Sequence, residues 1–190
     1  TAAHQVESDN INNDWYKWEE LGRIKDSESN LTGPDNWNEF ANDFDLAVAL
    51  NTNSYRMSIE WSKIEPTQDN YDTDAIARYH EILDALAARG IKPFVTVQHF
   101  TLPTWIHDPT PDAANGNSPT LPGWNDTAET PLIVEELVEF TADMAKEFGS
   151  KVDWWITINE PLVMYANGYL VGDFPPGIGY KNEITADFPL

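Results

Sequence analysis

Three stretches of this chain repeat one plan, in which an amphipathic helix leads within a few residues into a short apolar strand. The helices are predicted at 36–51, 72–90 and 130–149, and the strands at 53–59, 92–97 and 152–158. In each helix, large apolar residues recur every three or four positions, as on a face that packs against a sheet. Strands joined by helical crossovers run parallel and are buried on both faces. The plan therefore predicts an α/β fold with a parallel sheet.

The segments that leave the predicted strands are longer than those that enter them. They cover 60–72, 98–129 and 160–190, and also 8–35 if "TAAHQVE" ends a first strand, and they are rich in Trp, Pro, Asn and Gly. One elaborated face is typical of a (β/α)8 TIM barrel, whose sites lie at the carboxyl ends of the strands. We predict that residues 1–190 form one domain, the N-terminal half of such a barrel with about four βα units.

A doubly wound, nucleotide-binding sheet is the alternative architecture. It would carry a glycine-rich turn after its first strand, where the phosphates bind. The nearest stretch, "GIGYKN" at 177–182, has neither the glycine spacing nor a strand before it. The sequence therefore favours the barrel.

Polar residues stand at or near the carboxyl ends of the predicted strands: Gln5, Arg56, His99, Asn159 and Glu160. Glu160 follows the apolar strand "WWITI". It would be a general acid if aromatic neighbours such as Trp154 and Trp155 hold its proton in place. The alternative is a glutamate that only caps a loop.

The other strand-end residues also have a functional and a structural interpretation. Gln5, His99 and Asn159 suit hydrogen bonds to adjacent hydroxyls of a polyol, or they are structural polar groups. Arg56 is predicted to point inward, where it would need a carboxylate partner. Tryptophans in the loops, Trp105 among them, suit stacking on sugar rings, although core packing explains them equally well.

No metal site and no cofactor are expected. His4, His99 and His107 do not show a metal-binding helix spacing such as H-E-x-x-H. The chain contains no cysteine, which excludes disulfides and thiolate metal sites and favours a cytoplasmic location.

The charge balance limits the partners. Against 32 acidic residues stand 11 basic ones, a net charge of −21, which argues against nucleic acid and against an anionic membrane surface. No apolar run approaches the roughly 18 residues of a membrane span, and no signal peptide opens the chain. The excess of acidic residues fits a protein from a halophilic source, where salt screens the repulsion between carboxylates, or an ordinary acidic protein.

Five strings stand in one order along the chain: "TAAHQVE", "YRMSIEWSKIEP", "QHFTLPTWIHDP", "WWITINEP" and "GYLVGDFPPG". Together they resemble the N-terminal half of glycoside hydrolase family 1, the retaining β-glucosidases and β-galactosidases. The resemblance covers essentially the whole chain. The strings "FPPG" and "LPTWIHDP" look closest to archaeal-type members.

The resemblance implies roles for individual residues. Glu160 matches the family's acid/base, which protonates the leaving oxygen and later deprotonates water. Asn159 matches the residue that binds the sugar 2-hydroxyl and the nucleophile. Gln5 and His99 match the residues that hold the 3- and 4-hydroxyls in the −1 subsite. Arg56 matches the arginine that contacts the nucleophilic glutamate and keeps it ionised.

The resemblance also implies a less specific role for Trp105, and the chain departs from the family's pattern at two points. Trp105 is expected near the mouth, toward the aglycone. Phe100 stands where the family usually has Trp, which removes an indole N–H expected at the 3-hydroxyl and puts fine sugar selectivity in doubt. The nucleophile's Glu-Asn-Gly motif is absent from the chain, and neither Glu60 nor Glu65 matches it.

The leading hypothesis is thus a β-glycosidase acting on β-linked glucosides or galactosides. Its second half, which supplies the nucleophile, would be a separate chain, a second copy or a segment beyond this sequence. The alternatives are a catalytically silent sugar-binding or interaction module and an inactive fragment.

Overall fold

Three parallel strands form the main sheet of the computed structural model, which describes residues 1–179. The strands are β1 (Ser54–Ser58), β2 (Lys92–Gln98) and β5 (Trp154–Ile158), with β2 in the centre. All three end at the same edge, because Ser58 pairs with Thr96 and Gln98 with Ile158. The predicted parallel α/β arrangement is confirmed.

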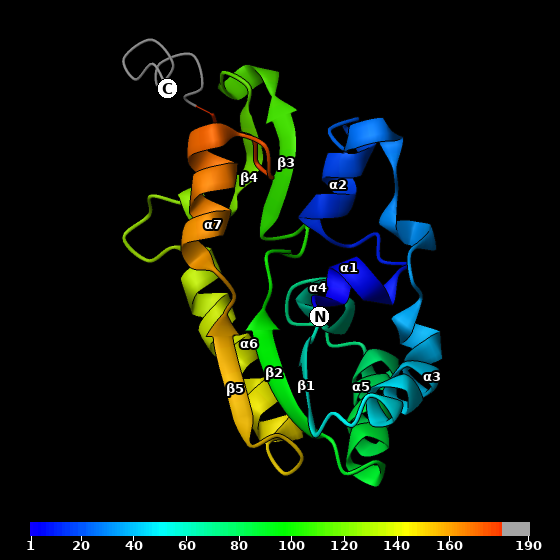
Figure 1. The fold of residues 1–190 in the computed structure, drawn as a ribbon. Helices are drawn as coiled ribbons and strands as arrows, with labels where there is room; N and C mark the ends of the chain where they lie inside the picture. The colour runs from blue at the N-terminus through cyan, green and yellow to red at the C-terminus, as the bar shows by residue number, and fades with distance from the viewer. Residues whose placement is uncertain (180–190) are drawn as a thin grey trace.

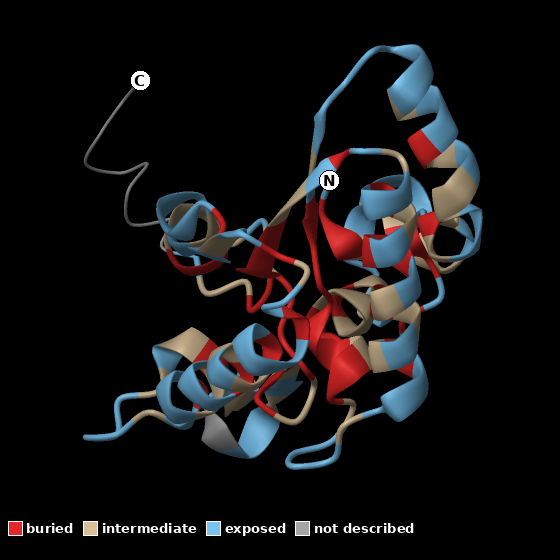
Figure 2. Cartoon of the chain, turned by 90° about the horizontal axis from the view of Figure 1, so that it is seen from below, coloured by how far each residue is buried: buried red, intermediate tan, exposed pale blue. Residues whose placement is uncertain are grey.

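Three long helices pack against this sheet: α3 (Asn36–Ala49), α5 (Thr73–Ala88) and α6 (Leu132–Phe148) (Figure 1). They contribute Phe44, Tyr79, Phe140 and Phe148, each 0% exposed, to one core with the valines of β2. The buried segments accordingly lie in the middle of the molecule and the exposed helix faces around it (Figure 2).

The helix ends differ in detail from the prediction. Asp72 precedes α5 as its cap, and its carboxylate accepts from the N–H groups of Asp74 (2.9 Å) and Ala75 (3.0 Å). Pro131 stands at the cap position of α6. Asp126 accepts from the first N–H of that helix, at Leu132 (3.2 Å).

The N-terminal segment corrects the prediction of a first strand. Residues Ala3–Glu7 form the short helix α1, which the Ala-rich, weakly β-branched string "TAAHQVE" favours. The N–H of Ala3 donates to Ser58 Oγ at 2.7 Å, which fixes α1 at the carboxyl end of β1. The described residues therefore show three strands of a barrel-like sheet rather than about four.

The long connecting segments carry structure of their own and lie above the sheet in Figure 1. They form α2 (Asp14–Glu20), η1 (Lys25–Ser27), η2 (Asn30–Thr32), α4 (Trp61–Ile64), β3 (His107–Asp112), η3 (Ala113–Asn115), β4 (Ser118–Pro122), η4 (Gly123–Asn125), α7 (Pro161–Tyr165) and η5 (Ala166–Val171). The strands β3 and β4 pair as an antiparallel hairpin. The predicted segment 160–190 and "GIGYKN" lie partly outside the described residues.

Both margins of the sheet are open in the described part of the chain, where no closed barrel forms. Beside β1, large apolar side chains are exposed at Leu46 (64%) and Val48 (46%) on helix α3 and at Leu50 (77%), which directly follows it. At the other margin Trp154 on β5 is 54% exposed and Leu162 on α7 is 80% exposed. Among residues 1–179 no helix has the length and apolar character needed to cross a membrane.

Candidate active site

The carboxyl edge of the sheet gathers the predicted site residues. β2 ends at Gln98 and is followed by His99, and β5 ends at Ile158 and is followed by Asn159 and Glu160. The N–H of Asn159 donates to the carbonyl of Gln98 at 2.9 Å, so strand pairing continues to the first residue of the loop. This hydrogen bond brings the two loop starts side by side.

Arg56 reaches this edge from the middle of β1. Its guanidinium donates to Asn159 Oδ1 and, at 3.4 Å, to Thr96 Oγ1, and so crosses all three strands. Asn159 is 5% exposed, whereas Arg56 is exposed. Within residues 1–179 the guanidinium has no carboxylate partner, so the one that the sequence predicts would have to come from outside this part of the chain.

Gln5 and His99 line one small cavity of about 70 Å³. His4, Trp15, Phe100 and Phe174 also surround it. Trp15 packs edge-on to Phe174 at 4.8 Å between ring centroids, and Phe174 lies 5.9 Å from Phe100. The result is an aromatic wall beside two hydrogen-bonding side chains, an arrangement that suits a polyol with one apolar face.

The environment of His99 favours its neutral form. Burial, and then the positive charge of Arg56, lower the pKa of His99 to about 4. A neutral imidazole has one donor and one acceptor nitrogen. It can therefore take either role toward a hydroxyl group at neutral pH.

Glu160 has an unusual backbone conformation and a solvent-exposed side chain. Its φ of 42° lies in the left-handed region, which is rare for residues other than glycine. It stands at the cap position of α7, with Pro161 in the first turn, and its carbonyl accepts from Val163 (3.0 Å) and Met164 (3.1 Å). The side chain is exposed and has no partner within the described residues.

The prediction that Trp154 and Trp155 surround the Glu160 carboxylate is wrong. Trp154 pairs with Phe94 at the start of the strands and stacks on its ring at 5.7 Å. It therefore lies at the far end of β5 from Glu160, and Trp155 follows it directly. In the described part of the chain, these tryptophans do not keep water from the carboxylate.

Trp105 contacts residues of the core. Its indole N–H donates to the carbonyl of Glu65 at 2.9 Å, and its ring packs edge-on to Trp61 at 6.0 Å. These contacts attach it to the core below the loop. It does not line the cavity that holds Gln5 and His99, and its position relative to an aglycone stays a prediction.

The cavity wall contains residues that the sequence analysis did not select. His4 adjoins Gln5, and its Nδ1 lies 3.3 Å from Asn13 Nδ2. Trp15 belongs to the Trp-rich segment 8–35, and Phe174 lies in the string "GYLVGDFPPG". The sequence signal for Trp15 and Phe174 was that each lies in one of these segments. That signal does not show which aromatic ring faces the cavity.

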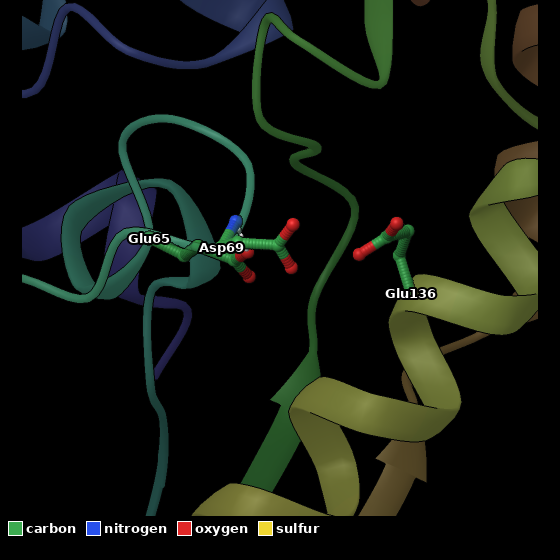
Figure 3. Close-up of side chains that lie close together, drawn as sticks. All are labelled: Glu65, Asp69 and Glu136. Carbon is green, nitrogen blue, oxygen red and sulfur yellow. Dashed lines mark hydrogen bonds between the residues drawn. The ribbon is translucent and has the colours of Figure 1, made fainter.

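An acidic cluster lies elsewhere, between α4 and α6. Ligand atoms of Glu65, Asp69 and Glu136 lie within 4.8 Å of one another (Figure 3). Glu65 accepts from the Trp61 indole (2.7 Å) and from the Asp69 N–H (2.9 Å), and Glu136 accepts from Gln68 (2.6 Å). Burial raises the pKa of both glutamates. Because these hydrogen bonds account for the glutamates, we assign no metal to them.

Comparison with known proteins gives consistent matches. The profile of the family described as "Glycosyl hydrolase family 1" matches residues 2–188. A coniferin beta-glucosidase of Pinus contorta is 34% identical over 156 residues, which are 82% of this chain and 28% of that protein. A beta-galactosidase of Pyrococcus woesei is 30% identical over 206 residues, covering 88% and 39%.

Solved structures agree with the sequence matches. The crystal structure of a rice Os3BGlu6 beta-glucosidase superposes with a TM-score of 0.82 at 28% identity, and the match covers 96% of this chain and 37% of that one. The chain thus spans well under half the length of the relatives that it matches.

Proposed function

This chain belongs to glycosyl hydrolase family 1, and on that premise we propose that it is the N-terminal half of a retaining β-glycosidase with Glu160 as the acid/base. The observation that carries the proposal is the hydrogen bond from Arg56 to Asn159 beside Glu160. It joins a cation and an amide next to Glu160 in the chain, at the edge where such barrels perform their chemistry.

The proposed reaction has two steps. In the first, Glu160 protonates the glycosidic oxygen while a carboxylate supplied by the second half attacks the anomeric carbon and forms a glycosyl-enzyme. In the second, Glu160 removes a proton from water, which releases the sugar with its configuration retained. The two carboxyl groups would stand roughly 5 to 5.5 Å apart.

The other site residues bind and orient in this proposal. Asn159 would hold the sugar 2-hydroxyl, and Gln5 and His99 the 3- and 4-hydroxyls in the −1 subsite. Arg56 would contact the incoming nucleophile and keep it ionised. Its lack of a carboxylate partner in the described residues supports this role.

The partner of this chain would be a complementary C-terminal half-barrel. The chain spans 28% to 39% of the relatives' length, and apolar side chains are exposed at both margins of its sheet. Both facts support a second half that closes the barrel, either in a longer chain or as a separate one.

The proposed substrates are β-linked glucosides or galactosides, in line with the relatives' names. Phe100 on the cavity wall offers no hydrogen-bond donor, which would loosen selection at the 3-hydroxyl. We also propose an archaeal-type, halophilic source and a cytoplasmic location, supported by the acidic surplus and the absence of cysteine. A sugar-binding module without catalysis is the second candidate, because the chain holds only one matched catalytic carboxylate.

The test is the stereochemistry of hydrolysis by the assembled protein, that is, this chain with its native second half. We expect hydrolysis of p-nitrophenyl β-glucoside or β-galactoside, with the β-anomer formed first in the proton NMR spectrum. The chain alone should be inactive. Release of the α-anomer would exclude the retaining mechanism, and binding without turnover would favour the silent module.

A further inference from the structure

A buried polar network lies under the cavity that holds Gln5 and His99. Tyr79, on the core helix α5, is 0% exposed. Its hydroxyl donates to the Glu7 carboxylate (2.8 and 3.0 Å) and accepts from the Glu60 N–H (2.8 Å). One hydroxyl therefore ties α1, which carries Glu7, to Glu60, the cap residue of α4 just after β1.

The Glu60 carboxylate extends this network to the loop after β2. It is 2% exposed and accepts from Thr101 Oγ1 (2.9 and 3.0 Å) and from Ser62 Oγ (2.6 Å). Thr101 follows Phe100, whose φ of 73° marks a sharp turn directly after His99. The bond to Glu60 thus holds the turn that carries His99.

Charge makes the network sensitive to the loss of any member. Lys63 lies 3.3 Å from Glu7 and 4.0 Å over the ring of Trp37. Among residues 1–179 the ammonium group of Lys63 therefore pairs with Glu7 alone, and burial raises the pKa of both Glu7 and Glu60. An acceptor left without its donors in such a site is costly.

The network ends next to the proposed sugar ligands on both sides. Gln5 stands two residues before Glu7 on the same short helix, and His99 stands two residues before Thr101. Gln5, His99 and Thr101 all line the cavity of about 70 Å³.

We propose that Glu7, Tyr79, Glu60 and Thr101 are positioning residues that fix the separation of Gln5 and His99 so that both bind adjacent hydroxyls of one sugar ring. The inference rests on the proposed function, since it takes Gln5 and His99 as sugar ligands. A displacement of about 1 Å at such ligands is enough to cost a large factor in rate.

The experiment uses Tyr79→Phe and Thr101→Val in the assembled protein, that is, this chain with its native second half. Tyr71→Phe and Thr120→Val are matched controls, because each removes a hydroxyl that donates outside the network, to Asp143 (3.1 Å) and to the Thr110 carbonyl (2.8 Å). The probe is castanospermine, a polyhydroxylated mimic of glucose, and Kd is measured by calorimetry. Deuterium uptake is followed for residues 2–7 and 99–103.

Tyr79→Phe and Thr101→Val should weaken binding about tenfold or more, and the controls less than about twofold. Deuterium uptake should rise at 2–7 in Tyr79→Phe and at 99–103 in Thr101→Val. Glu60→Gln should bind within about threefold of wild type, because its amide oxygen still accepts from Thr101. Retained binding in Glu60→Gln would distinguish a positioning role of the network from a general loss of stability.

Two results would overturn the inference. The first is wild-type affinity in both network variants when they are folded. The second is unchanged deuterium uptake in both segments. If the wild-type protein does not bind castanospermine, the proposed function fails, and the deuterium uptake alone decides whether the network fixes the two segments. If Tyr79→Phe does not fold, the castanospermine affinity and deuterium uptake of Thr101→Val and Glu60→Gln test the inference.

Discussion

Glu160 and Phe100 both adopt left-handed backbone conformations directly beyond the sheet, at φ 42° and 73°. Such a conformation costs a non-glycine residue about 1–3 kcal/mol unless its surroundings enforce it. Glycine would remove the cost at Glu160, yet this position carries a carboxylate at the mouth of the site. This fits a side chain kept for its chemistry rather than for stability.

The first prediction concerns Glu160→Gln in the assembled protein. Substrates with poor leaving groups need the proton, so their glycosylation should slow by about 100-fold or more, while dinitrophenyl glycosides should lose much less. Added azide should restore turnover and yield the β-glycosyl azide, since a small anion needs no general base. Glu135→Gln, on the exposed face of α6, is the control. Equal losses for both substrate classes, or no azide product, would refute the acid/base role.

The second prediction follows from His99. Its pKa is lowered from 6.5 to about 4, so the unfolded chain binds more protons between these values and stability rises with pH across that window. The stability is lost as the pH falls from 6.5 toward 4. His99→Gln should flatten this part of the melting-temperature profile. A slope identical to that of wild type would show that His99 does not titrate in this way.

At the scale of single elements, α6 depends on its buried face. Phe140 is 0% exposed and stacks on Trp61 at 5.0 Å between ring centroids. Phe140→Ala should cost about 3–5 kcal/mol of unfolding free energy in urea titrations. Val138→Ala, at a position 65% exposed, should cost less than about 0.5 kcal/mol in this chain alone. Similar losses at both positions would contradict the packing described.

The long periodic elements were predictable because one physical cause dominates each of them. Helix α5 begins after a capping aspartate and ends before Gly90, whose φ is 69°, and both signals can be read in the sequence. The hairpin β3–β4 could not be predicted, since its strands contain Pro109, Pro111, Pro119 and Pro122. Proline argues against a strand, but a two-stranded ribbon tolerates it on the unpaired side.

The site was predictable to the extent that strand ends determine it. Arg56, His99, Asn159 and Glu160 come from strands that end at one edge. Trp105 shows the limit, because an aromatic loop residue can pack on the core or face a ligand, and composition does not separate the two. The network through Tyr79 was also not foreseeable, since its members come from four distant segments.

At the scale of the whole molecule, the margins of the sheet carry the argument for a second half. Apolar surface that barrel closure would bury is exposed at both margins. It belongs to Leu46 and Leu50 at the end of α3, and to Trp154 and Leu162 at the opposite margin. Open sheet edges of this kind also favour non-specific association. The isolated chain is therefore expected to be less soluble than the assembled protein.

The net charge gives a prediction for the whole molecule. With a charge of −21, the folded protein should gain stability in molar salt, since screening reduces the repulsion between its carboxylates. Melting temperatures in a potassium chloride series should rise. A series in sucrose at constant ionic strength controls for general solute effects. A flat or falling trend in salt would remove the halophilic interpretation.

The central claim is that this chain supplies the acid/base and that another segment supplies the nucleophile. Incubating the assembled protein with a dinitrophenyl 2-deoxy-2-fluoro-β-glucoside should trap the glycosyl-enzyme, because the fluorine slows both steps while the good leaving group keeps the first one fast. Peptide mass spectrometry then locates the sugar. The account predicts a labelled glutamate outside residues 1–190. A label on Glu60, Glu65 or any other residue of this chain, or no covalent label in an active preparation, would contradict it.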